Sequence, residues 1–115
     1  MSDTSTIEQI SGNYWYGTYG EFRVVMMKNN GYINATKMCQ SVGKDYNDWV
    51  NLRATQELIN ELEVRILKRY WETNVIESDN APRILVLNKN CTQITGTYCY
   101  ADLISNLVLW LGKTM

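Results

Sequence analysis

The sequence predicts a small α+β domain, and three patterns lead to that prediction. An apolar run at 22–28 is followed by Asn29-Asn30-Gly31, which is typical of a tight hairpin turn. Apolar residues recur at helical spacing from Thr55 onward, as in a long amphipathic helix. Two further apolar runs, 83–87 and 94–99, flank a polar segment and indicate a second hairpin. A chain of 115 residues has room for one such domain.

The N-terminal part gives the weakest pattern. Residues 1–13 are polar and show no clear period, so we expect a flexible leader there. The aromatic and glycine-rich stretch 14–20 is expected to be an irregular segment that packs its rings on the domain. Stacking of these rings on the bases of a single strand is the less common alternative. The first hairpin then runs from the strand at 22–28 to a returning strand at 32–34.

Two short helices are expected next. The first covers 35–42 and stops at Gly43, because glycine is a natural helix terminator. Asp45 can cap the second helix, which Trp49, Val50 and Leu52 should anchor to the core. Short helices joined by Gly43-Lys44 form a helix-turn-helix candidate, a geometry that lets a second helix lie in the major groove.

The remaining elements follow from periodicity and breakers. The long helix starts at Thr55 and carries mixed charge on its outer face, so we interpret it as a solvated scaffold. Residues 72–82 are polar and acidic and end at Pro82, which indicates a loop. The tip of the second hairpin is expected at 88–93. A C-terminal helix should begin near Ala101 and end at Gly112, which leaves 113–115 as a tail.

Composition excludes several kinds of site. The chain has no histidine, the usual general base and the commonest metal ligand, so we expect no enzyme, no cofactor and no metal. Zinc would need four thiolates, and the three cysteines, Cys39, Cys91 and Cys99, are interpreted as reduced and structural. A pairing of Cys91 with Cys99 stays conceivable, since they flank the second hairpin tip. Without a signal peptide or an apolar run long enough for a bilayer, we expect an intracellular protein that does not enter membranes.

Two blocks of sequence resemble a known family. Residues 31–39 read GYINATKMC and are followed by Trp49 and by LRATQELI at 52–59. Residues 96–103 read GTYCYADL, and Trp110 comes after them. Together these blocks closely resemble the KilA-N domain of poxviruses, other large DNA viruses and phages, which is similar to the APSES DNA-binding domain of fungi. The resemblance covers 14–112, with Tyr100-Ala101 where the family commonly has His-Pro.

The resemblance implies nucleic-acid binding through a helix-turn-helix and a β-hairpin wing. DNA is the expected partner, with modest affinity and weak sequence selectivity, and single-stranded DNA or RNA are alternatives. The protein is expected in the host cytoplasm, with viral factories as one place there. The residues carried over to the binding surface lie in the first short helix (Lys37), in the turn after it (Lys44), in the second short helix (Asn47, Asn51 and Arg53) and at the wing tip (Lys89, Asn90 and Gln93).

Residue chemistry divides these candidates into two groups. Lys37, Lys44 and Lys89 would contact phosphates, which orient a complex without reading its sequence. The amide side chains among the candidates can pair with an adenine edge, and Arg53 can pair with guanine or phosphate. Helix capping, turn formation or solvent exposure would explain the same polar residues without any ligand.

The net charge is the main objection to nucleic-acid binding, because affinity for a duplex comes largely from phosphate neutralisation. The net charge is only −1. Its distribution is uneven, however: 15–53 holds five cations and three acids, 81–115 holds three cations and one acid, and the acids gather in 54–80. The positive excess therefore lies in the two segments that the family uses for binding.

A protein-interaction module is the alternative from another class. The exposed side of the long helix or the aromatic segment would then dock a host or viral protein, or a second copy in a homodimer. Many poxvirus KilA-N proteins also carry a RING zinc domain and act as ubiquitin ligases. This chain contains no such Cys/His array, so on its own we expect no ligase activity, and it would serve as the partner-binding part of a larger protein.

Overall fold

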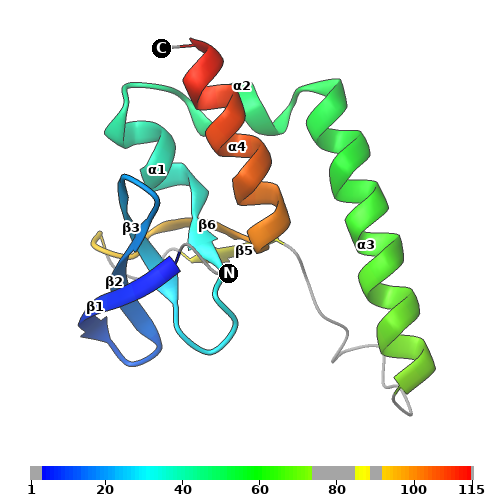
Figure 1. The fold of residues 1–115 in the computed structure, drawn as a ribbon, viewed down its shortest axis with the longest axis horizontal. Helices are drawn as coiled ribbons and strands as arrows, with labels where there is room; N and C mark the ends of the chain where they lie inside the picture. Colours follow the sequence, from blue (N-terminus) through cyan, green and yellow to red (C-terminus); the bar gives the residue numbers. More distant parts are fainter. Residues whose placement is uncertain (1–3, 74–84, 89–91, 115) are drawn as a thin grey trace.

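The computed structural model describes residues 4–73, 85–88 and 92–114, which form one antiparallel sheet with helices on one side (Figure 1). The sheet has six strands in the order β1-β2-β3-β4-β6-β5. The strands are β1 (Thr4–Ser11), β2 (Tyr14–Tyr19), β3 (Phe22–Met27), β4 (Ile33–Asn34), β5 (Leu85–Asn88) and β6 (Gly96–Cys99). The helices are α1 (Ala35–Ser41), α2 (Tyr46–Val50), α3 (Arg53–Thr73) and α4 (Ala101–Thr114). The predicted α+β class is confirmed.

The N-terminal expectations were wrong in two places. Instead of a leader, residues 4–11 form β1, an edge strand that pairs antiparallel with β2. Instead of an irregular segment, residues 14–19 form β2, which pairs along its whole length with β3. The simple alternation that would have revealed β2 is missing because its aromatic residues are half-buried on both faces.

Both faces of the sheet bury apolar side chains. On one face the helices cover a core that contains Val24, Met26 and Ile33 of the sheet together with Trp49 of α2 and Leu107 of α4. The other face gathers a second cluster around Val25, Met27, Tyr32, Ile94 and Tyr98. Cations extend the aromatic packing, since Lys28 lies over the Trp15 ring and Arg23 over the Tyr16 ring.

The sheet curls around this second cluster. Tyr14 of β2 and Tyr98 of β6 have ring centroids 5.4 Å apart, although β3 and β4 lie between their strands. In a flat sheet, strands three places apart would be separated by about 14 Å. The curl therefore brings the two rings together without any helix on that face.

The turns around α1 and α2 are confirmed in detail. Gly43 has φ +73°, its N–H donates to Gln40 O, and the Lys44 N–H donates to Cys39 O, which is a Schellman termination of α1. The Asp45 carboxylate accepts the Asn47 N–H at 2.8 Å and caps α2, as predicted. In the first hairpin, Gly31 supplies the positive φ alone, because none of the described non-glycine residues has one.

Several boundaries and anchors differ from the prediction. Trp49 is fully buried, whereas Leu52 is 40% exposed and does not anchor α2. Helix α3 begins at Arg53 and runs to Thr73, which is past the expected start of the loop. Helix α4 continues through Gly112 to Thr114, because its buried residues Leu107 and Leu111 hold the last turns against the core. The expected loop from residue 74 and the residues 89–91 lie outside the described part of the chain.

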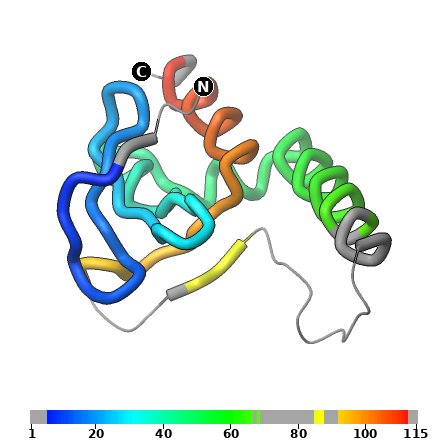
Figure 2. Tube along the Cα trace, turned by 60° about the horizontal axis from the view of Figure 1, so that its bottom comes forward, coloured from blue at the N-terminus to red at the C-terminus, as the bar shows by residue number. Residues whose placement is uncertain are grey.

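The second hairpin is part of the sheet and does not stand free as a wing. Strand β6 pairs with β5 on one side and with β4 on the other, through Ile33 with Cys99 and Asn34 with Tyr98. Helix α3 lies at the side of the sheet (Figures 1 and 2). No helix in the described ranges has the length and hydropathy needed to cross a membrane.

Gly96 has no room for a side chain. Its φ is +143°, and a Cβ there would lie 2.8 Å from Asn34 Nδ2, a group that is fully buried. We expect Gly96→Ala to lower the free energy of unfolding by about 2–4 kcal/mol, through backbone strain and a displaced buried amide. Gly43→Ala is the matched control, because it also has positive φ but faces open space, and it should cost only about 1 kcal/mol. Equal losses in urea unfolding would contradict the role of Asn34.

Buried thiols should make the fold sensitive to alkali. Burial raises the pKa of Cys99 from 9.0 to about 12 and that of Cys39 to about 11. Above pH 9.0 the unfolded Cys99 thiol loses its proton while the folded one keeps it, so the unfolded state binds fewer protons and stability falls as pH rises.

Replacing Cys99 shows how much of the pH dependence of stability comes from its thiol. Urea unfolding under reducing conditions should show that Cys99→Ala weakens the decline by about 1.4 kcal/mol per pH unit above the unfolded pKa. The variant will be less stable at neutral pH, so the slope against pH is the quantity to compare. An unchanged slope would show that this thiol does not titrate on unfolding.

Candidate nucleic-acid interface

The candidate interface is organised by the fully buried side chain of Asn34. Its Oδ1 accepts the Lys37 N–H at 2.9 Å and so caps α1, while its Nδ2 donates to Thr95 O at 3.0 Å. A longer bond from Nδ2 reaches Ile94 O, which also accepts the Tyr98 hydroxyl. One amide thus joins the start of α1 to the segment before β6.

Two half-buried neighbours of Asn34 also connect α1 to this segment. Thr36 Oγ1 accepts the Thr97 N–H at 3.0 Å, and Lys37 Nζ donates to Thr92 O at 2.8 Å. The first turn of α1 and the turn at 92–94 therefore form one continuous surface. Thr92 and Gln93 are exposed on it.

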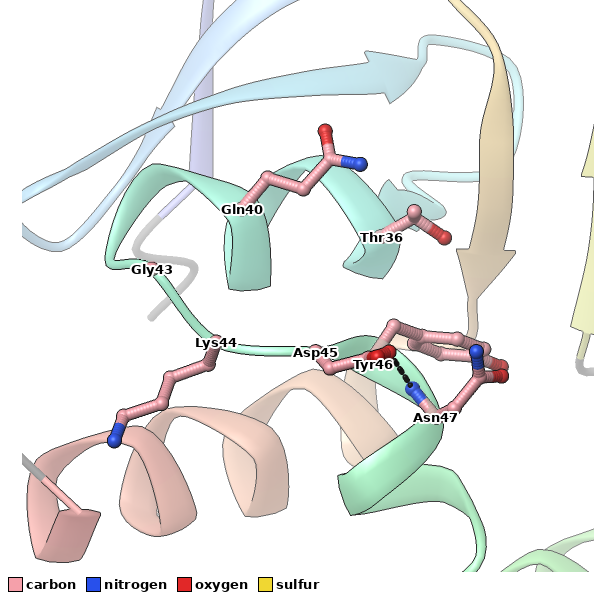
Figure 3. A pocket seen from close by; sticks show the side chains of 7 residues that line it. All are labelled: Thr36, Gln40, Gly43, Lys44, Asp45, Tyr46 and Asn47. Atoms are coloured by element: carbon pink, nitrogen blue, oxygen red, sulfur yellow. Dashed lines mark hydrogen bonds between the residues drawn. The ribbon is translucent and has the colours of Figure 1, made fainter.

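A polar hollow of about 440 Å³ lies between α1 and the N-terminal end of α2 (Figure 3). Its lining consists of Thr36, Gln40, Gly43, Lys44, Asp45, Tyr46 and Asn47. Thr36, Tyr46 and Asn47 lie at one end, whereas Lys44 extends away from Asn47 at the other end (Figure 3). The hollow is thus asymmetric, with hydroxyl, ring and amide groups together at the end that faces β6.

The Tyr46 ring forms a fixed wall of this hollow. Burial raises its pKa to about 12, so its hydroxyl stays protonated. Thr97 and Cys99 of β6 are among the groups that influence the pKa of its hydroxyl, and its ring packs on Trp49 with centroids 5.8 Å apart. Asp45, the N-cap of α2, adds one exposed carboxylate to the lining beside Tyr46.

The predicted site residues do not all come together. Lys37 lies beside the turn that carries Gln93, and Asn47 is exposed on the hollow with Lys44 at its far end. Asn51 is the exposed C-cap of α2, where its N–H donates to Asn47 O.

Arg53 was assigned to the wrong helix. It is the first residue of α3, its side chain is 93% exposed, and its Nε bonds Glu57 Oε1 at 3.1 Å. The predicted positions Lys89 and Asn90 lie outside the described residues.

Sequence reasoning missed the residues that hold the interface in place, above all Asn34, and the Thr36, Gln40 and Tyr46 lining of the hollow. Asn34 could have been found, because asparagine directly before an amphipathic run is a common N-cap signal. The hollow depends on how α1 and α2 cross, which no local pattern predicts. Within 4–73, 85–88 and 92–114, no group of three or more cysteine or acidic side chains could hold a metal ion.

Comparison with known proteins identifies the family. A family model described as the KilA-N domain matches residues 17–114. The chain belongs to the KilA-N family. This family is a class of binding domains generally linked to nucleic acids. No solved structure matches the chain significantly.

The relatives of this KilA-N domain are viral. A KilA-N domain-containing protein of Acanthamoeba polyphaga mimivirus is 36% identical over 90% of this chain and 21% of its own length. One from Invertebrate iridescent virus 6 is 32% identical over 90% of this chain and 41% of its own. An uncharacterized protein of fowlpox virus is 33% identical over 92% of this chain and 66% of its own. The chain thus spans less than half of the first two relatives.

Proposed function

We propose that this KilA-N domain binds DNA with modest affinity and weak sequence selectivity, through α1, the start of α2 and the turn at 92–94. The observation that supports this most is the bond from Lys37 Nζ to Thr92 O. This bond places the ammonium group of Lys37, on α1, directly beside the polar turn of the second hairpin. Helix α1 and this turn lie in the two parts of the sequence, 15–53 and 81–115, in which cations outnumber acids.

Lys37 remains able to contact a phosphate in this arrangement. An ammonium group has three donors, and Thr92 O uses one of them. Since few cations lie on the surface, few phosphates can be neutralised, and the expected affinity is modest and salt-dependent. Exposed amides of Asn47, Asn51 and Gln93 add hydrogen bonds to bases, and Lys44, Arg53, Lys89 and Asn90 complete the proposed set. The host cytoplasm, including viral factories, is the proposed place of action.

Replacing Lys37 tests the proposed phosphate contact. We expect Lys37→Ala to weaken duplex binding about five- to tenfold at low salt and to reduce the slope of log affinity against log salt by about 1, for all sequences alike. Lys37→Arg keeps both the charge and the donor to Thr92 O and should bind nearly as well as the original chain. Titration of labelled duplexes at several salt concentrations measures both quantities.

Lys68→Ala is the matched control, because it removes an exposed cation from α3, outside the proposed surface. It should leave the salt slope unchanged. Equal effects of Lys37→Ala and Lys68→Ala would indicate nonspecific attraction by net charge, and no binding at low salt would contradict the proposed function.

Self-association is a second candidate, favoured by the pattern on α3. Val64 is 67% exposed at the middle of the helix, with Glu57, Glu61 and Glu63 before it and cations after it. In an antiparallel pair of α3 helices, the acids of one copy would face the cations of the other. The domain would then act as a dimerisation or partner-binding part of a longer protein.

Sedimentation at increasing concentration tests this candidate. Val64→Arg should shift a monomer–dimer equilibrium toward monomer at least tenfold, because it places like charge and a long side chain at the two-fold axis. Leu109→Arg on α4 is the matched control, since Leu109 is also 66% exposed, and it should not change the equilibrium. A chain that stays monomeric at all accessible concentrations would contradict self-association.

A further inference from the structure

The hollow between α1 and α2 has a chemistry that differs from that of a phosphate site. Asp45 places an exposed carboxylate in its lining, and Lys44 extends away from the end that holds Asn47 (Figure 3). Negative side chains repel a phosphate, so the backbone of a nucleic acid is the part least suited to this end. A neutral ligand with hydrogen-bond donors and acceptors is suited to it.

The groups at this end match such a ligand. Thr36, Tyr46 and Asn47 provide a hydroxyl, an aromatic ring and an amide within one small space (Figure 3). An asparagine amide can donate and accept at once, which is the pattern that reads a base edge. Aromatic rings are the usual platforms for unstacked bases. The hollow of about 440 Å³ also falls within the roughly 300–1,000 Å³ range of small-ligand pockets.

Shape decides which form of nucleic acid can use these groups. The base edges of a duplex lie at the floor of a groove, where they meet side chains that project from a helix. Asn47 instead belongs to a concave wall, and α2 has only five residues. A base can enter a concave wall only after it has left its stack, which costs least in a single strand.

We propose that the hollow binds one unpaired base of a single-stranded nucleic acid, with Asn47 on the base edge and Tyr46 as the wall against its ring. This inference rests on the proposed function and narrows it, because Lys37 and the turn at 92–94 supply the phosphate contacts on the adjoining surface. The domain then prefers single strands to duplexes. DNA and RNA share the base chemistry, so both are included in the test.

The test compares three labelled probes: a short adenine-rich single strand of DNA, the same strand in a duplex, and the same sequence as RNA. We expect the better of the two single strands to bind at least tenfold more tightly than the duplex. Asn47→Ala should remove most of that preference by weakening single-strand binding about tenfold and duplex binding less than twofold. The ratio of the DNA and RNA affinities measures which of the two single strands the hollow prefers.

Asn60→Ala is the matched control, because Asn60 is an exposed asparagine on α3, away from the hollow. It should leave all three affinities unchanged, and the melting temperatures of both variants should equal that of the original chain. Duplex binding as tight as single-strand binding, or equal weakening of both by Asn47→Ala, overturns the base-binding hollow and leaves DNA binding intact. Absence of binding to every probe at low salt overturns the proposed function itself.

Discussion

The arrangement of this domain depends on the burial of one amide. Asn34 has no exposed surface, and its two polar atoms face different parts of the chain: the start of α1 and the segment before β6. Leaving either atom without a partner would cost about 1–3 kcal/mol. Both are satisfied only when α1 and the second hairpin occupy one relative position, and Gly96 leaves the space that this position requires.

The curled sheet explains why the interface lies where it does. All helices described here pack on one face, and the aromatic cluster on the other face is enclosed by the curl itself. Polar groups of the proposed surface lie where α1 leaves β4 and meets the turn at 92–94. The proposed interface is therefore at this junction.

Local signals were predicted well and contacts distant in sequence were not. Gly43 and Asp45 act through bonds within a few residues, so the end of α1 and the start of α2 could be predicted from the sequence. Strand β1 could not be predicted from the sequence, because its polar residues show no apolar pattern. Backbone pairing with β2 holds this strand in place. Arg53 was misplaced because the sequence does not mark the break between α2 and α3 with glycine or proline.

For the candidate site, residue type could be predicted more reliably than position. Asn47 and Gln93 are exposed as their chemistry suggested, but only the crossing of α1 and α2 places Asn47 in the wall of a hollow. The proposed binding surface also combines two requirements in one residue. The Asp45 carboxylate caps α2, and its negative charge would disfavour a phosphate beside Asn47. In the proposed complex this helix cap would favour bases over phosphates in the hollow. Lys37, whose Nζ donates to Thr92 O, would keep two donors for the backbone of the nucleic acid.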